Sequence, residues 1–301
     1  MVRVQIPATT ANLGPGFDTL GMALKLYNVV EIEETACGIT IEAEGEGADK
    51  IPRDQSNIVY LAAHRVFQEA KYTPKGLRIR LINNIPVARG LGSSAAAIVG
   101  GLIGANIIAG SPFSDKDIMN FAAAIEGHPD NVAPALVGGI VISTMVEGEV
   151  KCCKIDPHPG LKCVVAIPDF PLPTKLAREV LPQQVTMHDA VFNISRVALL
   201  VAAFIKGDLA MLSTAMEDRL HQPYRANLVP GMKKVFAAAR LAGAKGVALS
   251  GAGPTLIAFC DQNAGPVAKV MKDTFWEAGI HAKVLELEPN PVGARALEVM
   301  K

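Results

Sequence analysis

The sequence predicts an α+β protein with two domains, and three observations lead to that prediction. The chain has 301 residues, of which 50% are hydrophobic, which is enough for a large core and, at roughly 150 residues each, for two domains. Runs with strand-like alternation are interleaved with runs of helical spacing. The first strand-like runs follow one another without a helix between them, so an α+β architecture fits better than one doubly wound sheet.

The first domain is expected to begin with strands and to continue with helices. Strands are predicted at 2–6, 26–34, 38–45 and 77–84. In the third of these, Ile39, Ile41 and Ala43 alternate with polar residues, as in a half-buried strand. A helix is predicted over 56–70, with Ser56 as its N-cap, because the apolar residues recur at helical spacing.

The remaining elements place a domain boundary near the middle of the chain. Helices at 93–108 and 114–125 precede a hairpin made of 137–145 and 150–155. The turn-rich segment DPHPG then separates a first domain, 1–158, from a second, 159–301. The second domain is expected to contain a strand at 161–168, helical stretches through 175–241, strands around 246–250 and 255–260, a helix at 264–278 and a strand at 281–288.

The overall composition disfavours several classes of function. Basic and acidic residues balance at 29 each, so binding to nucleic acid or to an anionic membrane surface is not expected as the main role. The longest uninterrupted apolar stretch, 197–205, is far shorter than the roughly 20 residues that span a bilayer. The five cysteines contain no C-x-x-C pair and are expected to be free thiols. We therefore expect a cytoplasmic protein that acts without nucleic acid or a membrane.

A loop rich in glycine and serine, PVARGLGSSAA, lies between a predicted strand and a predicted helix. Gly90 and Gly92 let the backbone turn, so that N–H groups at the helix N-terminus can bind a phosphate. Ser93 and Ser94 can add hydroxyls to a phosphate oxygen or to Mg²⁺. The loop lacks the lysine of a Walker A motif, and no acidic residue follows at the position typical of a dinucleotide site. A simple packing loop is the structural alternative.

Two further glycine-rich stretches lie far apart in the chain. In PATTANLGPGFD, Asn12 and Asp18 place an amide and a carboxylate on a kinked loop, where Asp18 could accept a substrate hydroxyl or ammonium. The alternative is an Asx turn in which Asp18 caps a helix. In SGAGPT, Gly251 and Gly253 form either an ordinary turn between strands or a second backbone nest that closes on a ligand.

A fourth stretch, EGHPDN, gathers Glu126, His128, Asp130 and Asn131 within six residues. Such a polar cluster between apolar helices is costly to bury unless its members are paired or bind a ligand. No other His or Cys lies at zinc-ligand spacing, so Mg²⁺ held by Glu126 and a serine hydroxyl is the more natural metal site.

In this order, the three glycine-rich stretches resemble the signatures of the GHMP small-molecule kinases. Within that superfamily, EGHPDNVAPALVGG and the later HQPYRANLVPG are most similar to the homoserine kinase family, and the resemblance covers nearly the whole chain. It implies a first domain like domain 2 of ribosomal protein S5 and a ferredoxin-like second domain. It also implies ATP-dependent phosphorylation of the L-homoserine hydroxyl in threonine biosynthesis, with ATP and Mg²⁺ between the domains, and a possible homodimer.

The resemblance also assigns site residues. It implies that homoserine contacts Asn12, Asp18, His128, Arg178 and Arg225, and that Mg²⁺ is held by Glu126 with Ser93 or Ser94. It implies ATP binding by Asn57, Pro86, Val87, Ala88, Arg89, Gly90, Leu91, Gly92, Ser93, Ser94, Ala95, Ala96, Gly251 and Gly253. The residues expected to take part in the transfer are Asp18, Asn131 and Arg178. Each arginine could hold the substrate carboxylate through two hydrogen bonds, although a lone arginine is more often a surface residue.

Two features differ from related kinases. Mevalonate kinases resemble one another in using an aspartate near the fourth stretch with a partner lysine, whereas this chain has Asp130 and Asn131 and no obvious lysine. In homoserine kinases an asparagine stands near the transferred phosphate, which implies direct attack by the substrate hydroxyl. Only one residue separates Glu126 from His128, where other members have a longer loop. Alternatives that remain are a kinase for another small alcohol such as mevalonate, a non-catalytic sensor on the same fold, and a dinucleotide-dependent oxidoreductase.

Overall fold

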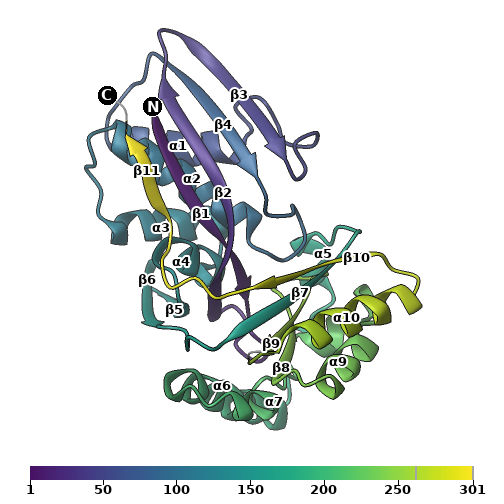
Figure 1. The fold of residues 1–301 in the computed structure, drawn as a ribbon. Coiled ribbons are helices and arrows are strands. Elements are labelled where there is room, and N and C mark those ends of the chain that lie inside the picture. The colour runs from purple at the N-terminus through teal and green to yellow at the C-terminus, as the bar shows by residue number, and fades with distance from the viewer. Residues whose placement is uncertain (262, 300–301) are drawn as a thin grey trace.

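The computed structural model describes residues 1–261 and 263–299, which form two β-sheets with helices packed against each (Figure 1). Residues 262, 300 and 301 of the predicted second domain lie outside the described part. The elements up to the predicted boundary are β1 (Val2–Ala11), β2 (Leu20–Glu34), β3 (Gly38–Gly45), α1 (Ile58–Glu69), β4 (Gly76–Asn83), α2 (Ser93–Ile108), α3 (Asp115–Glu126), α4 (Pro129–Val137), β5 (Ile140–Val146) and β6 (Glu149–Ile155). Those beyond it are β7 (Lys162–Pro168), α5 (Thr174–Glu179), α6 (Met187–Lys206), η1 (Leu209–Met211), α7 (Leu212–Ala215), α8 (Gln222–Arg225), η2 (Ala226–Leu228), α9 (Met232–Leu241), β8 (Gly246–Leu249), β9 (Leu256–Cys260), α10 (Gly265–Glu277), β10 (Ala282–Leu287) and β11 (Arg295–Val299).

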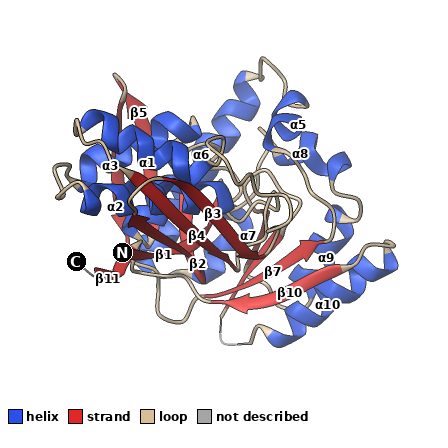
Figure 2. Ribbon diagram, turned by 90° about the horizontal axis from the view of Figure 1, so that it is seen from above, coloured by secondary structure: helices blue, strands red, loops and turns tan. Residues whose placement is uncertain are grey.

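The first sheet has the strand order β11-β1-β2-β4-β3, and β5 joins it by pairing with the start of β2 and with β6. Helices α1, α2 and α3 lie together on one side of this sheet (Figure 2). Helix α2 approaches strand β2 closely because glycines face it. A Cβ on Gly100 would lie 2.6 Å from Val30, and one on Gly104 would lie 2.8 Å from Ile32. The small residues of α2 therefore let the helix pack directly onto the sheet.

The second sheet has the antiparallel order β10-β7-β9-β8. With helices between β7 and β8 and between β9 and β10, the chain follows a βαββαβ path, which is the ferredoxin-like arrangement. Helices α9 and α10 pack together on this sheet (Figure 1). The predicted ferredoxin-like second domain and the predicted α+β class are confirmed.

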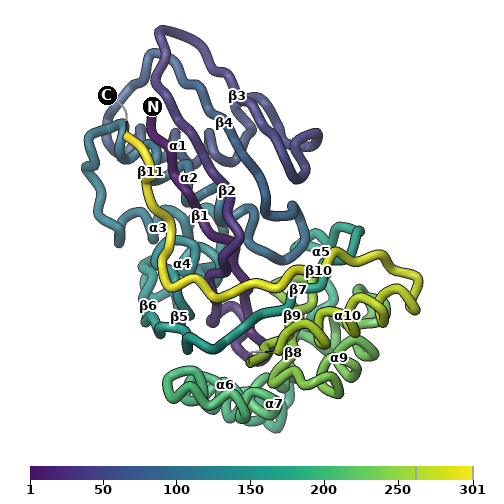
Figure 3. The backbone as a smooth tube through the Cα atoms, viewed as in Figure 1, coloured from purple at the N-terminus to yellow at the C-terminus, as the bar shows by residue number. Residues whose placement is uncertain are grey.

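The last strand, β11, was not predicted from the sequence. It returns from the second domain and pairs antiparallel with β1 in the first sheet. Figure 3 shows this segment running back beside β1, so that the last described strand lies next to the first. The change from one sheet to the other falls between Ile155 and Lys162, around the predicted boundary. The boundary itself stays a prediction. The described part of the chain after residue 159 forms the four strands of the second sheet and adds β11 to the first sheet.

Most predicted elements are present, with two corrections near the helices. The strand at 38–45 and the helix at 93–108 have the predicted bounds. The N-cap of α1 is Asn57 and not Ser56, because the Asn57 side chain accepts a hydrogen bond from the Val59 N–H while Ser56 bonds to Asp54. Helix α4 was not predicted, since its internal proline, Pro134, argues against a helix. Each of the five cysteines is a free thiol, as expected.

Helix α6 is, among the described residues, the one helix that is long and apolar enough to cross a membrane. In the fold it packs along the second domain, where Leu200 and Phe204 are buried and the Phe204 ring meets the Phe259 ring at 6.3 Å between centroids. Apolar residues such as Ile194 and Ile205 on its outer side are exposed. The expectation that the protein acts without a membrane stays a prediction.

Candidate active site

The three glycine-rich loops meet where the two domains join. The Gly251 N–H donates to the Ala11 carbonyl at 3.1 Å, which links the last loop to the first. The Ser250 hydroxyl contacts the Gly90 carbonyl at 2.6 Å, which links the last loop to the middle one. Asn12 donates its side-chain amide to the Gly251 carbonyl at 3.0 Å. Hydrogen bonds between the loops therefore build one site from three distant parts of the sequence.

A single pocket opens between these loops. It is lined by residues from both domains: Asn12, Phe17, Asp18, Ala88, Arg89, Gly90, Gly92, Ser93, Ser94, Glu126, His128, Asp130, Asn131, Thr174, Arg178, Arg225, Gly251 and Ala252. One end of the pocket is the phosphate-type loop, and the other carries charged side chains of both signs. This combination suits a ligand with a phosphate at one end and charged groups at the other.

At the phosphate end, Gly92 is the N-cap of helix α2, and it has φ +69° and no side chain to cap the helix. No side chain caps the first N–H groups of α2, and Gly92, Ser93 and Ser94 line the pocket, where the helix dipole adds positive potential. A Cβ on Gly92 would lie 1.9 Å from the Thr9 hydroxyl oxygen. Only glycine fits at this position, both for its conformation and for the space around it.

The backbone around the pocket is strained. Asn12, Leu13, Asp18 and Ala88 all have positive φ, between +49° and +70°. Asn and Asp tolerate this region better than other residues, but Leu13 and Ala88 gain nothing locally from it. Strain of this kind persists where surrounding contacts enforce it, and it is concentrated at functional sites.

Two pairs of polar side chains are in contact in the pocket lining. The Ser94 hydroxyl donates to Glu126 Oε2 at 2.9 Å, and His128 Nδ1 lies 2.5 Å from Asp130 Oδ1. Burial raises the pKa of Glu126, against the opposing effects of the Ser94 hydrogen bond and of His128. Burial lowers the pKa of His128, but its hydrogen bond to Asp130 and the charges of Asp130 and Glu126 outweigh it, so the net shift is upward. The arrangement favours a cation beside Glu126.

The charged end of the pocket contains an ion pair. Arg178 lies in the last turn of α5. Its Nη1 and Nη2 donate hydrogen bonds to the Asp18 carboxylate oxygens at 2.9 and 2.7 Å. The pair is accessible from the pocket, with side-chain exposures of 37% for Arg178 and 34% for Asp18. The hydrogen bond to Asp18 raises the pKa of Arg178 above its ordinary value. The guanidinium groups of Arg178 and Arg225 lie 5.4 and 5.2 Å from the Phe17 ring centre.

Arg225 reaches the same end from the core. It is 1% exposed, and its Nε donates to the Ala177 carbonyl at 2.9 Å. Burial, followed by the charge of Arg178, lowers the pKa of Arg225 to about 10. A carboxylate bound between the two arginines would relieve both the desolvation and the repulsion.

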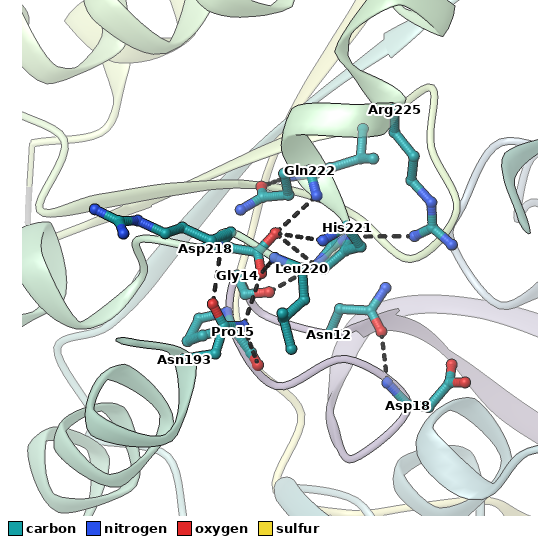
Figure 4. A network of polar contacts seen from close by, with 12 residues as sticks. Asn12, Gly14, Pro15, Asp18, Asn193, Asp218, Leu220, His221, Gln222 and Arg225 are labelled. Carbon is teal, nitrogen blue, oxygen red and sulfur yellow. Dashed lines mark hydrogen bonds and ion pairs between the residues drawn. The ribbon is translucent and has the colours of Figure 1, made fainter. Parts of the chain in front are cut away.

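A buried network behind the pocket fixes Arg225 and the first loop (Figure 4). His221 Nδ1 lies 3.2 Å from Arg225 Nη1, which can only donate, so Nδ1 is the acceptor. The other ring nitrogen, Nε2, then carries the hydrogen and donates to the Gly14 carbonyl at 2.7 Å. His221 thus connects the arginine to the loop that carries Asn12 and Asp18.

Asp218 completes this network. Its carboxylate accepts the backbone N–H groups of Leu220, His221 and Gln222 at 2.7–3.1 Å. It also accepts the Asn193 amide at 2.8 Å, and Asn193 reaches the Pro15 carbonyl at 3.3 Å (Figure 4). Helix α6, which carries Asn193, is thereby tied to the first loop.

The structure brings most of the predicted site residues into one pocket. All the residues predicted to bind substrate line it, as do Asn131, Glu126 and both serines. Ser94, rather than Ser93, contacts Glu126. Asp18 does not cap a helix, since no helix begins beside it. These positions agree with the predicted roles, which remain proposals.

Several residues predicted to bind ATP have other contacts or lie elsewhere. The Asn57 side chain is buried and bonds to the Val59 N–H and to the Pro52 carbonyl. The Arg89 guanidinium donates to the carbonyls of Pro168 and Asp169 in the second domain. The remaining residues outside the pocket lining are Pro86, Val87, Leu91, Ala95, Ala96 and Gly253, of which Leu91, Ala95 and Ala96 are packed in the core.

Sequence reasoning gave no role to several residues of the site, namely Thr9, Phe17, Thr174, Asp218 and His221. Phe17 lies between Asn12 and Asp18 in the first motif, so its position was a usable signal. His221 belongs to the HQPYRANLVPG stretch but looks like any single histidine until its partners are known.

The residues near the phosphate loop fit a magnesium ion. Mg²⁺ prefers oxygen ligands and usually binds one or two carboxylates together with phosphate oxygens and water. Glu126 and Ser94 supply a carboxylate and a hydroxyl 2.9 Å apart, beside the N-terminus of α2. Among the described residues, no group of three or more His, Cys, Asp or Glu side chains forms an all-protein metal cage. The donor set suits an ion that arrives with a phosphate ligand.

Comparison with known families agrees with this geometry. The family model described as "GHMP kinases N terminal domain" matches residues 57–139, and "GHMP kinases C terminal" matches residues 200–275. The chain therefore belongs to the GHMP kinase family.

Curated relatives of this chain within that family include homoserine kinases. The homoserine kinase of Moorella thermoacetica is 53% identical over 98% of this chain and 99% of its own length. That of Carboxydothermus hydrogenoformans is 47% identical over 98% of this chain and 96% of its own length. The likeness covers nearly the whole chain and therefore extends over both domains.

Solved structures give the same result for the fold. The crystal structure of homoserine kinase from Cytophaga hutchinsonii superposes with a TM-score of 0.89 at 31% identity, covering 98% of this chain and 97% of that one. Mevalonate kinase from L. major superposes with a TM-score of 0.72 at 17% identity, covering 95% of both chains. At that identity the second likeness concerns the fold alone. The predicted two-domain GHMP kinase fold is confirmed.

Proposed function

We propose that this enzyme transfers the terminal phosphoryl group of ATP to the hydroxyl of L-homoserine, giving O-phospho-L-homoserine in threonine biosynthesis. Relatives that are 47–53% identical over nearly the full chain are homoserine kinases. The observation that carries the proposal is that one pocket joins the phosphate-type loop to two arginines and Asp18. A phosphate donor and a charged amino acid can therefore meet in the same site.

The charged end of the pocket fits an amino acid. Homoserine carries a carboxylate, an ammonium and a hydroxyl. Arg178 and Arg225 would bind the carboxylate, since the planar guanidinium groups match it through paired hydrogen bonds. Asp18 would receive the ammonium or the hydroxyl, and Asn12 and His128 would complete the contacts. The positions of all five residues in one pocket support this assignment.

The ion pair between Asp18 and Arg178 favours a zwitterion over a simple acid. In a substrate that has both groups, the carboxylate can pair with Arg178 and the ammonium can pair with Asp18. These two contacts would replace the ion pair between Arg178 and Asp18. Mevalonate has a carboxylate but no ammonium, so it would pair Arg178 and leave the Asp18 carboxylate unpaired, which is costly in a partly buried site. This difference supports homoserine as the substrate.

ATP would bind with its triphosphate along the loop between β4 and α2. The N–H groups at the uncapped N-terminus of α2 would hold phosphate oxygens, and Gly90 and Gly92 let the backbone come close. The side chains of Leu91, Ala95 and Ala96 are buried, so these residues would contribute only backbone groups to ATP binding. The proposed role of Asn57 in ATP binding is limited by its two structural hydrogen bonds.

Mg²⁺ would be held by Glu126 and Ser94. When bound there it supplies positive charge that neutralises the phosphate oxygens during transfer. Substituting Glu126 by glutamine removes that carboxylate charge, so the Mg²⁺ concentration for half-maximal activity is expected to rise about tenfold or more. An unchanged Mg²⁺ requirement in a folded Glu126→Gln enzyme would contradict this assignment.

For the transfer itself we propose direct in-line attack. The homoserine hydroxyl oxygen forms a bond to the terminal phosphorus while the bond from that phosphorus to the bridging oxygen of ADP breaks, and the hydroxyl proton leaves with solvent or phosphate. Such reactions depend on alignment and charge neutralisation more than on a base. Asn131 would position the phosphate, Arg178 would hold the substrate, and Asp18 would orient the hydroxyl.

The substrate proposal is tested by measuring ADP release with ATP and Mg²⁺ across homoserine, mevalonate, shikimate and galactose. The expected result is turnover with homoserine at a kcat/KM at least about a hundredfold above that of the other alcohols, because only homoserine satisfies both charges. Faster turnover with mevalonate would reassign the substrate. Absence of ADP with every alcohol would indicate a non-catalytic sensor on the same fold.

We also propose that the enzyme works in the cytoplasm without nucleic acid or a membrane, and as a homodimer. The balance of 29 basic and 29 acidic residues and the five free cysteines support the first part. Exposed apolar residues on α6, such as Ile194 and Ile205, support the second. Light scattering of the purified protein gives the mass in solution, and a monomer at all concentrations would contradict the homodimer.

A further inference from the structure

Thr9 lies beneath the phosphate-type loop, near the end of strand β1. It is fully buried, at 0% exposure. Its hydroxyl donates to Asn131 Oδ1 at 2.8 Å, and its backbone N–H donates to the Leu91 carbonyl at 3.1 Å. One residue therefore contacts both the loop and helix α4, which carries Asn131.

The contacts of Asn131 define which way its amide points. Its Nδ2 lies 3.3 Å from Asp130 Oδ1, and a carboxylate oxygen accepts hydrogen bonds. Its Oδ1 accepts the Thr9 hydroxyl on the other side. The second N–H of the amide is then the group that can meet a phosphate oxygen in the pocket. A flipped amide would present its carbonyl oxygen to the phosphate, and two acceptors would repel each other.

The loop closes tightly over this pair. A Cβ on Gly92 would lie 1.9 Å from Thr9 Oγ1 and 3.3 Å from Asn131 Oδ1. The hydrogen bond between Thr9 and Asn131 thus lies next to Gly92, the N-cap of α2. A shift of the loop at Gly92 would move Thr9 and, through this hydrogen bond, the Asn131 amide.

We propose that Thr9 is a positioning residue for phosphoryl transfer, because its hydroxyl holds the Asn131 amide with the N–H side toward the transferred phosphate. The proposal rests on the proposed function, in which Asn131 meets that phosphate. Thr9 itself does not line the pocket, so it acts through Asn131 and through the loop.

The test compares Thr9→Val with Thr9→Ser by kcat, KM and thermal stability. Valine keeps the shape of threonine without the hydroxyl, whereas serine keeps the hydroxyl and leaves a small cavity. We expect kcat to fall about tenfold or more in Thr9→Val with the KM for homoserine within about threefold, and to stay within about threefold of wild type in Thr9→Ser. A packing role predicts the opposite order, with serine the more damaging change.

Thr10→Val is the matched control. Thr10 is the next residue of β1, is equally buried, and has its Oγ1 2.9 Å from the Ser250 hydroxyl instead of facing Asn131. The Thr10→Val variant loses one buried hydroxyl contact, so its free energy of unfolding should fall about as much as that of Thr9→Val. Its kcat should stay within about threefold of wild type. If Thr9→Val does not fold, Thr9→Ala removes the same hydroxyl without adding bulk.

A double-mutant cycle separates this proposal from the proposed function. In an Asn131→Ala background, Thr9→Val should lower kcat by less than about twofold, since the group that Thr9 positions is gone. Additive losses, or equal activity of Thr9→Val and wild type, would overturn the role of Thr9. If the wild-type enzyme makes no phosphohomoserine, the proposed function fails instead, and the same cycle is read on the alcohol that is turned over.

Discussion

Arg225 shows how individual residues set the charge of the site. It is 1% exposed, and burial and the charge of Arg178 together lower its pKa to about 10. The nearby carboxylates of Asp18, Asp218 and Asp130 act in the opposite direction and keep the guanidinium charged at neutral pH. The site thus holds two arginines that would benefit from a bound carboxylate. A substrate with a carboxylate gains binding free energy from this arrangement.

The role of Asp18 gives a prediction at the residue scale. If Asp18 orients the substrate and is not an obligatory base, Asp18→Asn should raise the KM for homoserine about tenfold or more while kcat falls much less, because the charge partner of Arg178 and of the substrate is lost. Initial rates over a range of homoserine concentrations measure both constants. Loss of turnover with homoserine affinity intact would identify Asp18 as a required base.

Among the elements, the start of α2 contributes most to the site. Gly92 has φ +69°, and a Cβ added to it would lie 1.9 Å from the Thr9 hydroxyl oxygen. Gly110, just beyond the end of the same helix, has φ +88° but nothing within 4 Å of an added Cβ. The two glycines therefore share a left-handed conformation and differ in the space around them.

This contrast predicts different costs for the same substitution. Gly110→Ala should lower the free energy of unfolding by about 1 kcal/mol, the cost of a left-handed alanine. Gly92→Ala should cost at least about 2 kcal/mol more and should raise the KM for ATP about tenfold or more, because the loop must move off Thr9. Urea denaturation and steady-state kinetics measure the two quantities. Equal effects at both positions would show that space at Gly92 is not limiting.

At the scale of the whole molecule, a buried network couples the domains and makes stability depend on pH. His221 is neutral at the centre of this network (Figure 4). Burial lowers its pKa below 6.5, Arg225 acts in the same direction, and Asp218 and Asp18 oppose the shift without reversing it. Since the folded pKa lies below the unfolded one, the unfolded chain binds more protons as the pH falls through that range.

The free energy of unfolding is therefore expected to be highest above about pH 6.5 with respect to His221, and to fall as the pH is lowered toward the folded pKa. A His221→Gln variant lacks this titration, so its loss of stability between about pH 7.5 and about pH 5.5 should be smaller than that of the wild type. Urea denaturation of both proteins at the two pH values measures the difference. Parallel losses would show that His221 does not titrate in this way.

The sequence predicted the elements with clear local patterns, such as alternation at 38–45 and a run of small apolar residues at 93–108, and it predicted the identity of the motifs. The structure explains what the sequence could not predict. The strand at 38–45 and the helix at 93–108 follow from local patterns, so their bounds were correct. Strand β11 depends on a partner almost 300 residues away, which no local pattern reveals. Helix α4 begins at Pro129 and contains Pro134, so its stability comes from packing and not from intrinsic preference.

The site follows the same division. The predicted substrate residues were found through motifs, and their common pocket agrees with those motifs. Thr9 and His221 lie inside two of the quoted motifs. Their partners, Asn131 and Gly14, are distant in sequence, so the motifs did not show which contacts these two residues make. Contacts between residues far apart in the sequence, rather than residue type, give these residues their positions.

The most direct test of the account is to identify the product. The enzyme, ATP, Mg²⁺ and L-homoserine are incubated together, and phosphorus NMR follows ADP and any phosphorylated product over time. We predict that O-phospho-L-homoserine forms in a one-to-one ratio with ADP and that its formation is lost in Arg178→Ala. Release of free phosphate in place of phosphohomoserine, or no consumption of ATP at all, would contradict the central claim.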